Sequence, residues 1–228
     1  MTAWRPALAP FLAEALGTFA LVFAGPGAAA VDAASGGAIG TVGIGISFGL
    51  IVMAMVFALG HISGCHINPA ITLAMLAQRR LSTRRAAGYV AAQVIGAVLA
   101  GLAIVAIVGS KGDAGVTVPH IGGTDAALFS EFILTFFLGF IVFAVATDSR
   151  AQGELAAVAI GGYVGFAAIG WGPVANASLN PARSFGPAAA AGVWDAHWVY
   201  WVGPVAGAVL AGFVYELLRE SPAPAKTG

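Results

Sequence analysis

The chain alternates long apolar runs with short polar segments. Six runs are long enough to cross a bilayer, at about 9–30, 39–60, 85–108, 127–147, 155–172 and 198–218. A helix of about 20 residues rises roughly 30 Å, which matches the thickness of the hydrocarbon core. Because the runs are continuously apolar and do not alternate residue by residue, they differ from the strands of a transmembrane barrel. We therefore predict an all-α membrane protein with six transmembrane helices.

A repeated polar tripeptide interrupts this apolar pattern in each half of the chain. Asn-Pro-Ala occurs at Asn68, Pro69 and Ala70 and again at Asn180, Pro181 and Ala182. Asn is a favoured helix N-cap, and Pro is favoured at the next position because no N–H group is needed there. Each tripeptide therefore predicts the start of a helix, from Asn68 to about Gln78 and from Asn180 to about Ala190. At roughly 16 Å, these helices are too short to cross the membrane.

Irregular segments precede both short helices, at about 60–66 and 172–178. Non-helical backbone at membrane depth is tolerated only where it is buried in protein or lines a water-filled cavity. Two re-entrant half-helices that enter from opposite faces would meet with their N-termini at the centre. The loop carbonyl groups would then offer acceptors along a path, and the positive ends of both helix dipoles would disfavour a cation. The pattern predicts a pore for neutral hydroxylic molecules.

The two halves of the chain match beyond the tripeptides. Glu14, Thr18 and Phe19 open the first half with the same spacing as Glu131, Thr135 and Phe136 open the second. Equivalent points are separated by three spans, and an odd number reverses the chain direction, so the repeats must be inverted. We predict one channel domain over 1–228, with inverted repeats at about 9–108 and 125–218 and a short tail at 220–228.

Composition favours a closely packed membrane bundle. Hydrophobic residues make up 59% of the chain and charged residues only 9%, against about a quarter charged in ordinary soluble domains. The 32 glycines recur at four-residue spacing, as at Gly45 and Gly49 and at Gly161 and Gly165. In lipid, such small residues let helix backbones approach, so we expect close helix crossings. The single cysteine, Cys65, excludes an intramolecular disulfide.

Basic residues fall on one side of the predicted topology. They are Arg5, Arg79, Arg80, Arg84, Arg85, Arg150, Arg219 and Lys226. The opposite loops carry Lys111 and the aspartates Asp32, Asp113, Asp125 and Asp195. The positive-inside rule makes the basic side cytoplasmic, so we expect a multi-pass protein of the cell inner or plasma membrane with both termini inside. Arg183 stands apart at membrane depth, where a charge normally faces a cavity.

The two loops resemble the signature loops of the aquaporins, the major intrinsic protein family. The resemblance rests on Gly60-His61-Ile62-Ser63-Gly64-x-His66 before the first tripeptide, on Asn176-x-Ser178 before the second and on Arg183-Ser184-Phe185-Gly186-Pro187 after it. It extends over nearly the whole chain and is closest to a water channel of prokaryotic type. It implies a right-handed bundle of six helices and two half-helices, with a pore in each subunit of a homotetramer.

The resemblance also implies which residues form the selectivity ring of the pore. Alignment from the motifs places this ring at Phe48, Ala168, Ala177 and Arg183. Strict water channels of the family usually carry His at the position of Ala168, so the methyl group should widen the ring and remove a polar contact. Phe48 replaces the usual Trp of glycerol facilitators. The ring is therefore expected to be intermediate, wide and apolar on two sides.

The loops are expected to supply both the lining of the pore and its support. The lining would come from the backbone of Gly64, Cys65, His66, Asn176 and Ser178. Glu14 and Glu131 are expected to accept hydrogen bonds from loop N–H groups, as scaffold rather than as proton-relay acids. His61 is expected to be a satisfied buried group beside the first loop. Cys65 is either a small filler or a thiol that reacts with mercurials.

These features predict a passive channel for water that also admits small uncharged solutes and excludes ions and protons. Ser184, Ala188 and the pair Tyr200-Trp201 resemble the water-channel branch more than the glycerol facilitators. A facilitator mainly for glycerol, urea or ammonia is the alternative, and an ion-coupled secondary transporter, which also uses inverted repeats, is a third reading. No nucleophile, base and acid form a set, so we expect no enzyme. We expect no cofactor, no metal and no nucleic-acid partner.

Overall fold

The computed structural model describes residues 5–109, 114–148, 150–151 and 155–219, and all regular elements in them are helices. In chain order these are α1 (Arg5–Ala34), α2 (Gly40–Ser63), α3 (Pro69–Ala77), α4 (Thr83–Val108), α5 (Gly123–Thr147), α6 (Ala156–Ala175), α7 (Pro181–Ala191) and α8 (Val199–Leu218). Six of them, all except α3 and α7, are long and apolar enough to cross a membrane. The predicted all-α fold with six transmembrane helices is confirmed.

Two of the long helices extend into segments that we expected to be irregular. The α2 helix continues to Ser63 and ends at Gly64, whose φ of 89° lies in the left-handed region. The α6 helix continues to Ala175, with Pro173 inside it, and ends at Asn176 with a φ of 63°. In both cases the capping residue donates its N–H to a carbonyl four positions back, so one left-handed residue ends each helix. The non-helical segments are therefore shorter than predicted.

Glycines bring helix backbones into contact at the predicted crossings. A Cβ atom on Gly49 of α2 would lie 2.9 Å from the carbonyl oxygen of Gly161 on α6. A Cβ atom on Gly207 of α8 would lie 2.3 Å from the carbonyl oxygen of Phe132 on α5. No larger residue fits at either position without moving a helix. The expected close crossings are confirmed, and they hold the long helices around a central space.

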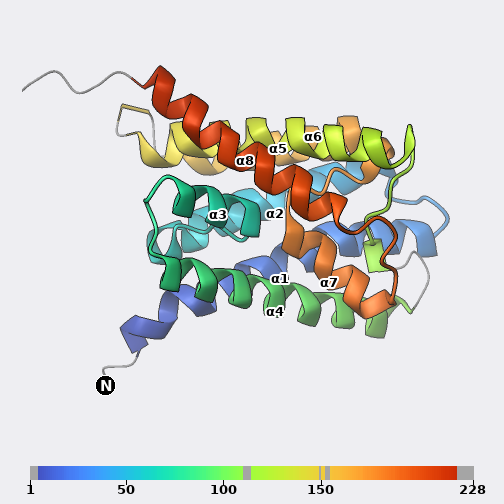
Figure 1. Cartoon of the computed structure of the whole chain (residues 1–228). Helices are drawn as coiled ribbons and strands as arrows, with labels where there is room; N and C mark the ends of the chain where they lie inside the picture. The colour runs from blue at the N-terminus through green and yellow to red at the C-terminus, as the bar shows by residue number, and fades with distance from the viewer. Residues whose placement is uncertain (1–4, 110–113, 149, 152–154, 220–228) are drawn as a thin grey trace, which may run out of the picture.

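The two half-helices enter that space from opposite ends of the bundle, α3 from the left and α7 from the right in Figure 1. With 9 and 11 residues, they rise about 14 and 16 Å. The α7 helix packs closely on α4, where a Cβ atom on Gly186 would lie 2.2 Å from the carbonyl oxygen of Ala97. The first and last described residues lie at the same end of the molecule.

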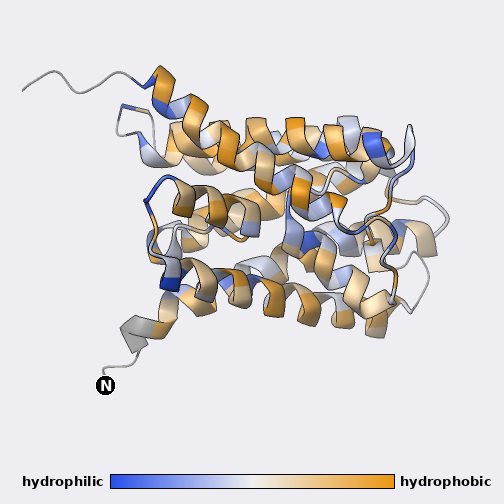
Figure 2. Cartoon of the chain, viewed as in Figure 1, coloured by the Kyte–Doolittle hydropathy of each residue, from blue (hydrophilic) through white to orange (hydrophobic). Residues whose placement is uncertain are grey.

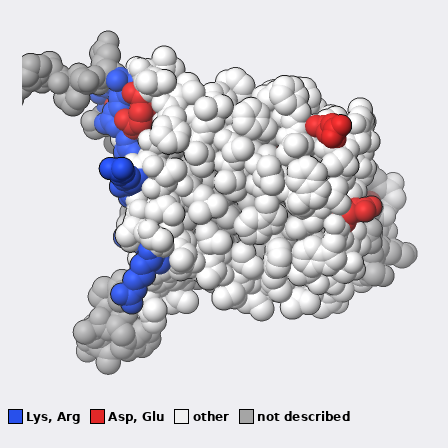
Figure 3. Space-filling model, viewed as in Figure 1, with Lys and Arg blue, Asp and Glu red and all other residues white. Residues whose placement is uncertain are grey.

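Apolar side chains cover the outside of the bundle, and charges gather at its two ends. Figure 2 shows the hydrophobic colouring along the outer helices, where Leu16, Leu99 and Phe129 are each more than half exposed. Figure 3 shows the Lys and Arg side chains at one end, with acidic groups at the other end and a few among the basic ones. Lys111, Asp113, Lys226, the side chain of Arg5 and the predicted tail at 220–228 lie outside the described part of the structure.

Candidate functional site

Asn68 and Asn180 cap the two half-helices at the centre of the bundle. The Asn68 Oδ1 atom accepts a hydrogen bond from the N–H of Ala70 at 2.9 Å. The Asn180 Oδ1 atom accepts from the N–H groups of Ala182 and Arg183 at 3.0 and 3.2 Å. Pro69 and Pro181 occupy the first helical positions. Both helix starts lie where the tripeptides predict them.

Each capping asparagine also binds the loop that precedes the other one. The Asn68 Nδ2 atom donates to the carbonyl oxygen of Leu179 at 2.7 Å. The Asn180 Nδ2 atom donates to the carbonyl oxygen of Ile67 at 2.8 Å. These reciprocal bonds hold the N-termini of α3 and α7 against each other. Each amide group has a second N–H, and no described residue accepts from it, so both can donate to a molecule between the helices.

Glu14 of α1 holds the first loop from behind. Its Oε1 atom accepts from the Ser63 hydroxyl at 2.6 Å and from the His66 N–H at 2.9 Å. Its Oε2 atom accepts from the Ile67 N–H at 2.6 Å and from Gln93 Nε2 at 2.7 Å. The carboxylate is fully buried. Four donors therefore satisfy this buried charge, and two of them are loop N–H groups that no helix could satisfy.

Glu131 of α5 plays the corresponding part for the second loop with fewer partners. Its Oε1 atom accepts from the Ser178 N–H at 2.6 Å, and its Oε2 atom accepts from the Leu179 N–H at 2.8 Å. The Ser178 hydroxyl lies 2.5 Å from that of Ser184, which continues the hydrogen-bonded network toward Thr117. Both acids thus bind loop backbone, as the sequence suggested.

Six loop carbonyl groups are left without a protein donor. They belong to Gly64, Cys65 and His66 in the first loop and to Asn176, Ala177 and Ser178 in the second, and none of the described residues donates to them. Alternating left-handed conformations, with φ of 47° at Cys65 and 42° at Ala177, turn the backbone at these positions. Buried carbonyl groups need a partner. Each of the six residues lines one of three cavities, where a passing molecule can supply that partner.

Three cavities follow one another through the bundle, and neighbouring cavities share lining residues. We call this succession of cavities the path. The outer cavity, lined by Ala168, Asn176 and Arg183, has a volume of about 390 Å³. The central cavity, lined by Asn68 and Asn180, has a volume of only about 50 Å³. The inner cavity has the largest volume of the three, about 890 Å³. Phe48 and Arg183 line both the outer and the central cavity.

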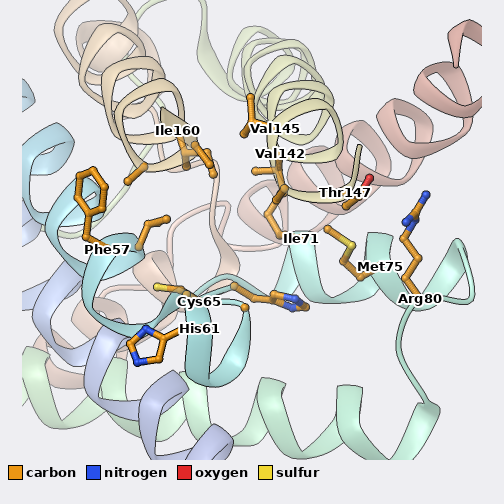
Figure 4. A pocket seen from close by; sticks show the side chains of 17 residues that line it. Phe57, His61, Cys65, Ile71, Met75, Arg80, Val142, Val145, Thr147 and Ile160 are labelled. Carbon is orange, nitrogen blue, oxygen red and sulfur yellow. The ribbon is translucent and has the colours of Figure 1, made fainter. Parts of the chain in front are cut away.

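At the other end of the path, the central and inner cavities share Ile71, Val142 and Ile160. Figure 4 shows these apolar side chains across the inner cavity from His61 and Cys65. The path therefore has apolar walls on one side and loop carbonyl groups on the other. The smallest of the three cavities is the one beside the two capping asparagines.

Arg183 and Phe48 form the outer constriction, where the outer cavity meets the central one. Arg183 is only 2% exposed, and its Nη1 atom donates to the carbonyl oxygen of Gly115 at 2.9 Å. Its Cζ atom lies 5.1 Å from the centre of the Phe48 ring. Phe48 can take this position because Gly25 has no side chain, since a Cβ atom there would lie 2.2 Å from the ring. No described residue accepts from the Arg183 Nε atom.

The structure brings three members of the expected ring together, and it places the fourth slightly deeper. Phe48, Ala168 and Arg183 all line the outer cavity. Ala177 lines the central cavity, one step further along the path. The methyl group of Ala168 leaves the outer cavity wider than a ring side chain would. All four side chains are at least nine-tenths buried.

His61 differs from what we expected. It is exposed at the inner cavity and makes no hydrogen bond within the described residues, so its predicted role as a buried, satisfied support of the loop is wrong. The reason is that α2 continues to Ser63, so His61 is a helix residue beside the inner cavity and not part of the loop. His120 is an exposed loop residue that lines the outer cavity with Arg183. Its N–H donates to the carbonyl oxygen of Val174 at 2.9 Å, which no sequence motif signals.

Comparisons with known proteins agree with this geometry. The family described as "Major intrinsic protein" matches residues 2–215. The chain is 43% identical over 219 residues to Aquaporin NIP1-1 of Oryza sativa subsp. japonica, covering 96% of this chain and 77% of that protein. It is 41% identical over 220 residues to Nodulin-26 of Glycine max, covering 96% and 81%. Among solved structures, the aquaglyceroporin from Plasmodium falciparum matches with a TM-score of 0.83 and 25% identity, covering 92% of this chain and 95% of that chain.

Proposed function

The chain belongs to the major intrinsic protein family, and we propose that it conducts water first and small uncharged solutes such as glycerol and urea second. It is a multi-pass membrane protein and a passive channel for water and small solutes. The observation that carries the proposal is the succession of three cavities that share lining residues, the smallest of which, about 50 Å³, is lined by Asn68 and Asn180.

The lining of the path suits a neutral hydroxylic molecule. The carbonyl groups of Gly64, Cys65 and His66 and of Asn176, Ala177 and Ser178 accept hydrogen bonds in sequence, while the capping asparagines donate at the centre. A water molecule both donates and accepts, so it can move along this path without losing hydrogen bonds. Glu14 and Glu131 serve this function indirectly, because they hold the loop backbone in its turned conformation.

Positive electrostatic potential at two levels opposes cations and hydronium. The N-termini of α3 and α7 meet at the centre, and each carries about half an elementary positive charge. Arg183 adds a full charge at the outer constriction, where the outer and central cavities meet, and it is 2% exposed there. Because this part of the path is buried, water screens these charges weakly. We assign the central barrier to Asn68 and Asn180 and the outer one to Phe48, Ala168, Ala177 and Arg183.

The size of the outer ring favours solutes larger than water as second permeants. At Ala168 a methyl group lines the outer cavity, so one wall of the ring is open and apolar. The Phe48 ring supplies a second apolar wall against which the carbon backbone of a small polyol can lie. Two relatives carry the names aquaporin and aquaglyceroporin. A facilitator mainly for glycerol, urea or ammonia is therefore the second candidate function.

The proposal also covers the oligomeric state of the protein and its orientation in the membrane. We propose a homotetramer with a separate pore in each subunit, one domain over 1–228 and inverted repeats at about 9–108 and 125–218. Lys and Arg side chains gather at the end of the molecule where the loop between α3 and α4 and the end of α8 lie (Figures 1 and 3). The positive-inside rule supports placing that end in the cytoplasm of a cell inner or plasma membrane, with both termini inside.

Osmotic measurements on reconstituted protein test this ranking of permeants. Proteoliposomes are mixed rapidly with hyperosmotic mannitol to measure water flux, and with glycerol or urea to measure the following re-swelling. We expect water permeability well above that of empty liposomes, together with measurable glycerol and urea re-swelling. Water flux at the level of empty liposomes, with rapid glycerol entry, would establish the facilitator instead.

A further inference from the structure

A groove on the outer surface of the bundle lies apart from the pore. It runs between α3 and the first half of α4 and has a volume of about 690 Å³. Leu73 and Leu76 of α3 line it on one side, and Ala86, Ala87, Val90 and Ala91 of α4 line it on the other. It shares no lining residue with the three cavities of the path. Small side chains on α4 make the hollow, and all its lining residues except Thr83 are apolar.

The length of the groove matches one leaflet of a bilayer. Its lining on α4 extends from Thr83 to Ile95, which corresponds to about 18 Å along a helix. Half of a hydrocarbon core measures about 15 Å. An acyl chain that follows this groove would therefore reach from the polar interface to the middle of the membrane.

A basic cavity adjoins the polar end of the groove. This second cavity, of about 590 Å³, is lined by Arg79, Arg80 and Ser82, and it shares Leu76 and Thr83 with the groove. Arg84 lies three and seven positions before Ala87 and Ala91, so it is on the same face of α4 as these two lining residues of the groove. Arg79 and Arg84 are both exposed.

The four arginines of this loop are not equivalent. Arg80 is paired with Glu216 of α8. Arg85 donates to the Tyr89 hydroxyl at 3.2 Å and stacks over its ring. Within the described residues, Arg79 and Arg84 have neither an ion pair nor a side-chain hydrogen bond. Two unpaired cations therefore stand at the polar end of an apolar groove of leaflet length.

We propose that this groove and its two unpaired arginines form a binding site for an anionic phospholipid. One acyl chain lies along Leu73, Ala87 and Ala91, and the phosphate group lies between Arg79 and Arg84. Basic clusters beside the cytoplasmic end of a transmembrane helix attract anionic headgroups. The site is in the cytoplasmic leaflet under the orientation proposed above, but binding itself does not depend on the transport function.

Thermal unfolding of the purified full-length protein in detergent tests the site. Phosphatidylglycerol and phosphatidylcholine with identical acyl chains are titrated, and inorganic phosphate is titrated separately. We expect phosphatidylglycerol to raise the unfolding temperature at much lower concentration than phosphatidylcholine, and inorganic phosphate to have no effect. Each arginine should strengthen binding about fivefold, so the double variant Arg79→Gln/Arg84→Gln should bind phosphatidylglycerol about 30-fold more weakly.

Two further variants separate the charge from the groove. Ala91 is exposed on the surface of α4, so Ala91→Phe fills the groove without disturbing the core and should weaken the effect of both lipids. Arg219 pairs with Asp148 and Glu216 and lines neither the groove nor the basic cavity. Arg219→Gln therefore removes a charge at the same end of the molecule, and it should keep the preference for phosphatidylglycerol. Equal effects of the two lipids on the wild type, a preference that survives in the double variant, an undiminished effect in Ala91→Phe, or stabilisation by phosphate alone would each overturn the proposal.

Discussion

Arg183 lies over the Phe48 ring at the outer constriction, where the outer and central cavities meet, with its Cζ atom 5.1 Å from the centre of the ring. The guanidinium group is fixed from the other side by the carbonyl oxygen of Gly115. The hydrogen bond and the ring contact hold the positive charge at the constriction, where it repels a cation. The Phe48 ring supplies an apolar wall beside it. The constriction thus combines a fixed charge at Arg183 with an open wall at Ala168. The charge should determine ion exclusion, and the open wall should determine the size of the solutes that pass.

Ala168→His should narrow the constriction and change the ranking of permeants. The imidazole would occupy part of the outer cavity that the methyl group leaves open. We expect glycerol and urea permeability to fall by about tenfold, a typical size discrimination in a fitted site, while water permeability changes much less. Stopped-flow light scattering on proteoliposomes measures both. Equal losses for water and glycerol would show that Ala168 does not line the limiting constriction.

Arg183→Val should raise the leak of protons and small cations. Two unit charges about 6 Å apart repel by roughly 3 kcal/mol at an effective dielectric constant of 20. Removing the charge should therefore raise cation passage by about two orders of magnitude if no other barrier dominates. A pH-sensitive dye inside liposomes reports the proton leak. Arg84→Gln, which removes an exposed charge far from the path, is the control, and a leak that is equal in both variants contradicts the role of Arg183.

The two buried acids should differ in their importance for stability. Glu14 accepts from four donors and Glu131 from two backbone donors. In Glu14→Gln, the new amide NH₂ faces two donors, and in Glu131→Gln it faces one. An unsatisfied buried donor costs about 1–3 kcal/mol, so Glu14→Gln should lower the unfolding temperature more. Thermal unfolding in detergent measures both, and a larger effect of Glu131→Gln would contradict this reading of the contacts.

Asp148, just past the end of α5, should stabilise the fold in a pH-dependent way. The Arg150 guanidinium and N–H and the Tyr215 hydroxyl bind its carboxylate and hold its pKa well below the usual range. Because the folded pKa lies below the unfolded value of about 3.9, this stabilisation is present above about pH 4 and is lost as the pH falls toward the folded pKa.

Asp148→Asn should therefore have a lower unfolding temperature than the wild type at neutral pH. The difference should shrink as the pH falls and the wild-type carboxylate is protonated. Thermal unfolding between pH 7 and pH 2 measures the two curves, and the difference between them should shrink below about pH 4. A difference that stays constant or grows as the pH falls would show that the carboxylate charge does not provide the stabilisation.

Some of this architecture was predictable because it depends on local chemistry. Asn68 and Asn180 are helix N-caps followed by proline, a signal that needs no distant contact. Glycine spacing predicted the helix crossings because backbone approach requires small residues. The ends of α2 and α6 were misplaced because a glycine or proline near a helix end does not say which residue turns left-handed. His61 was misassigned for the same reason.

The contacts of the loop before α5 were not predictable. Gly115 reaches Arg183 because it packs on Pro26, where a Cβ atom would lie 2.3 Å from the Pro26 carbonyl oxygen. Its sequence neighbours give no hint of this contact. His120 reaches the outer cavity through a backbone bond to Val174 that depends on the same loop path. Such contacts follow from tertiary packing and not from a motif.

We conclude that solute moves passively along the path between Asn68 and Asn180. Its most direct test is osmotic water flux through proteoliposomes, measured over a range of temperatures with and without imposed sodium and pH gradients. We predict a low activation energy, close to that of water diffusion, and equal flux under all gradients. A flux that requires a sodium or proton gradient, or that has the high activation energy of a transport cycle, would show that the protein is a transporter and not a passive channel.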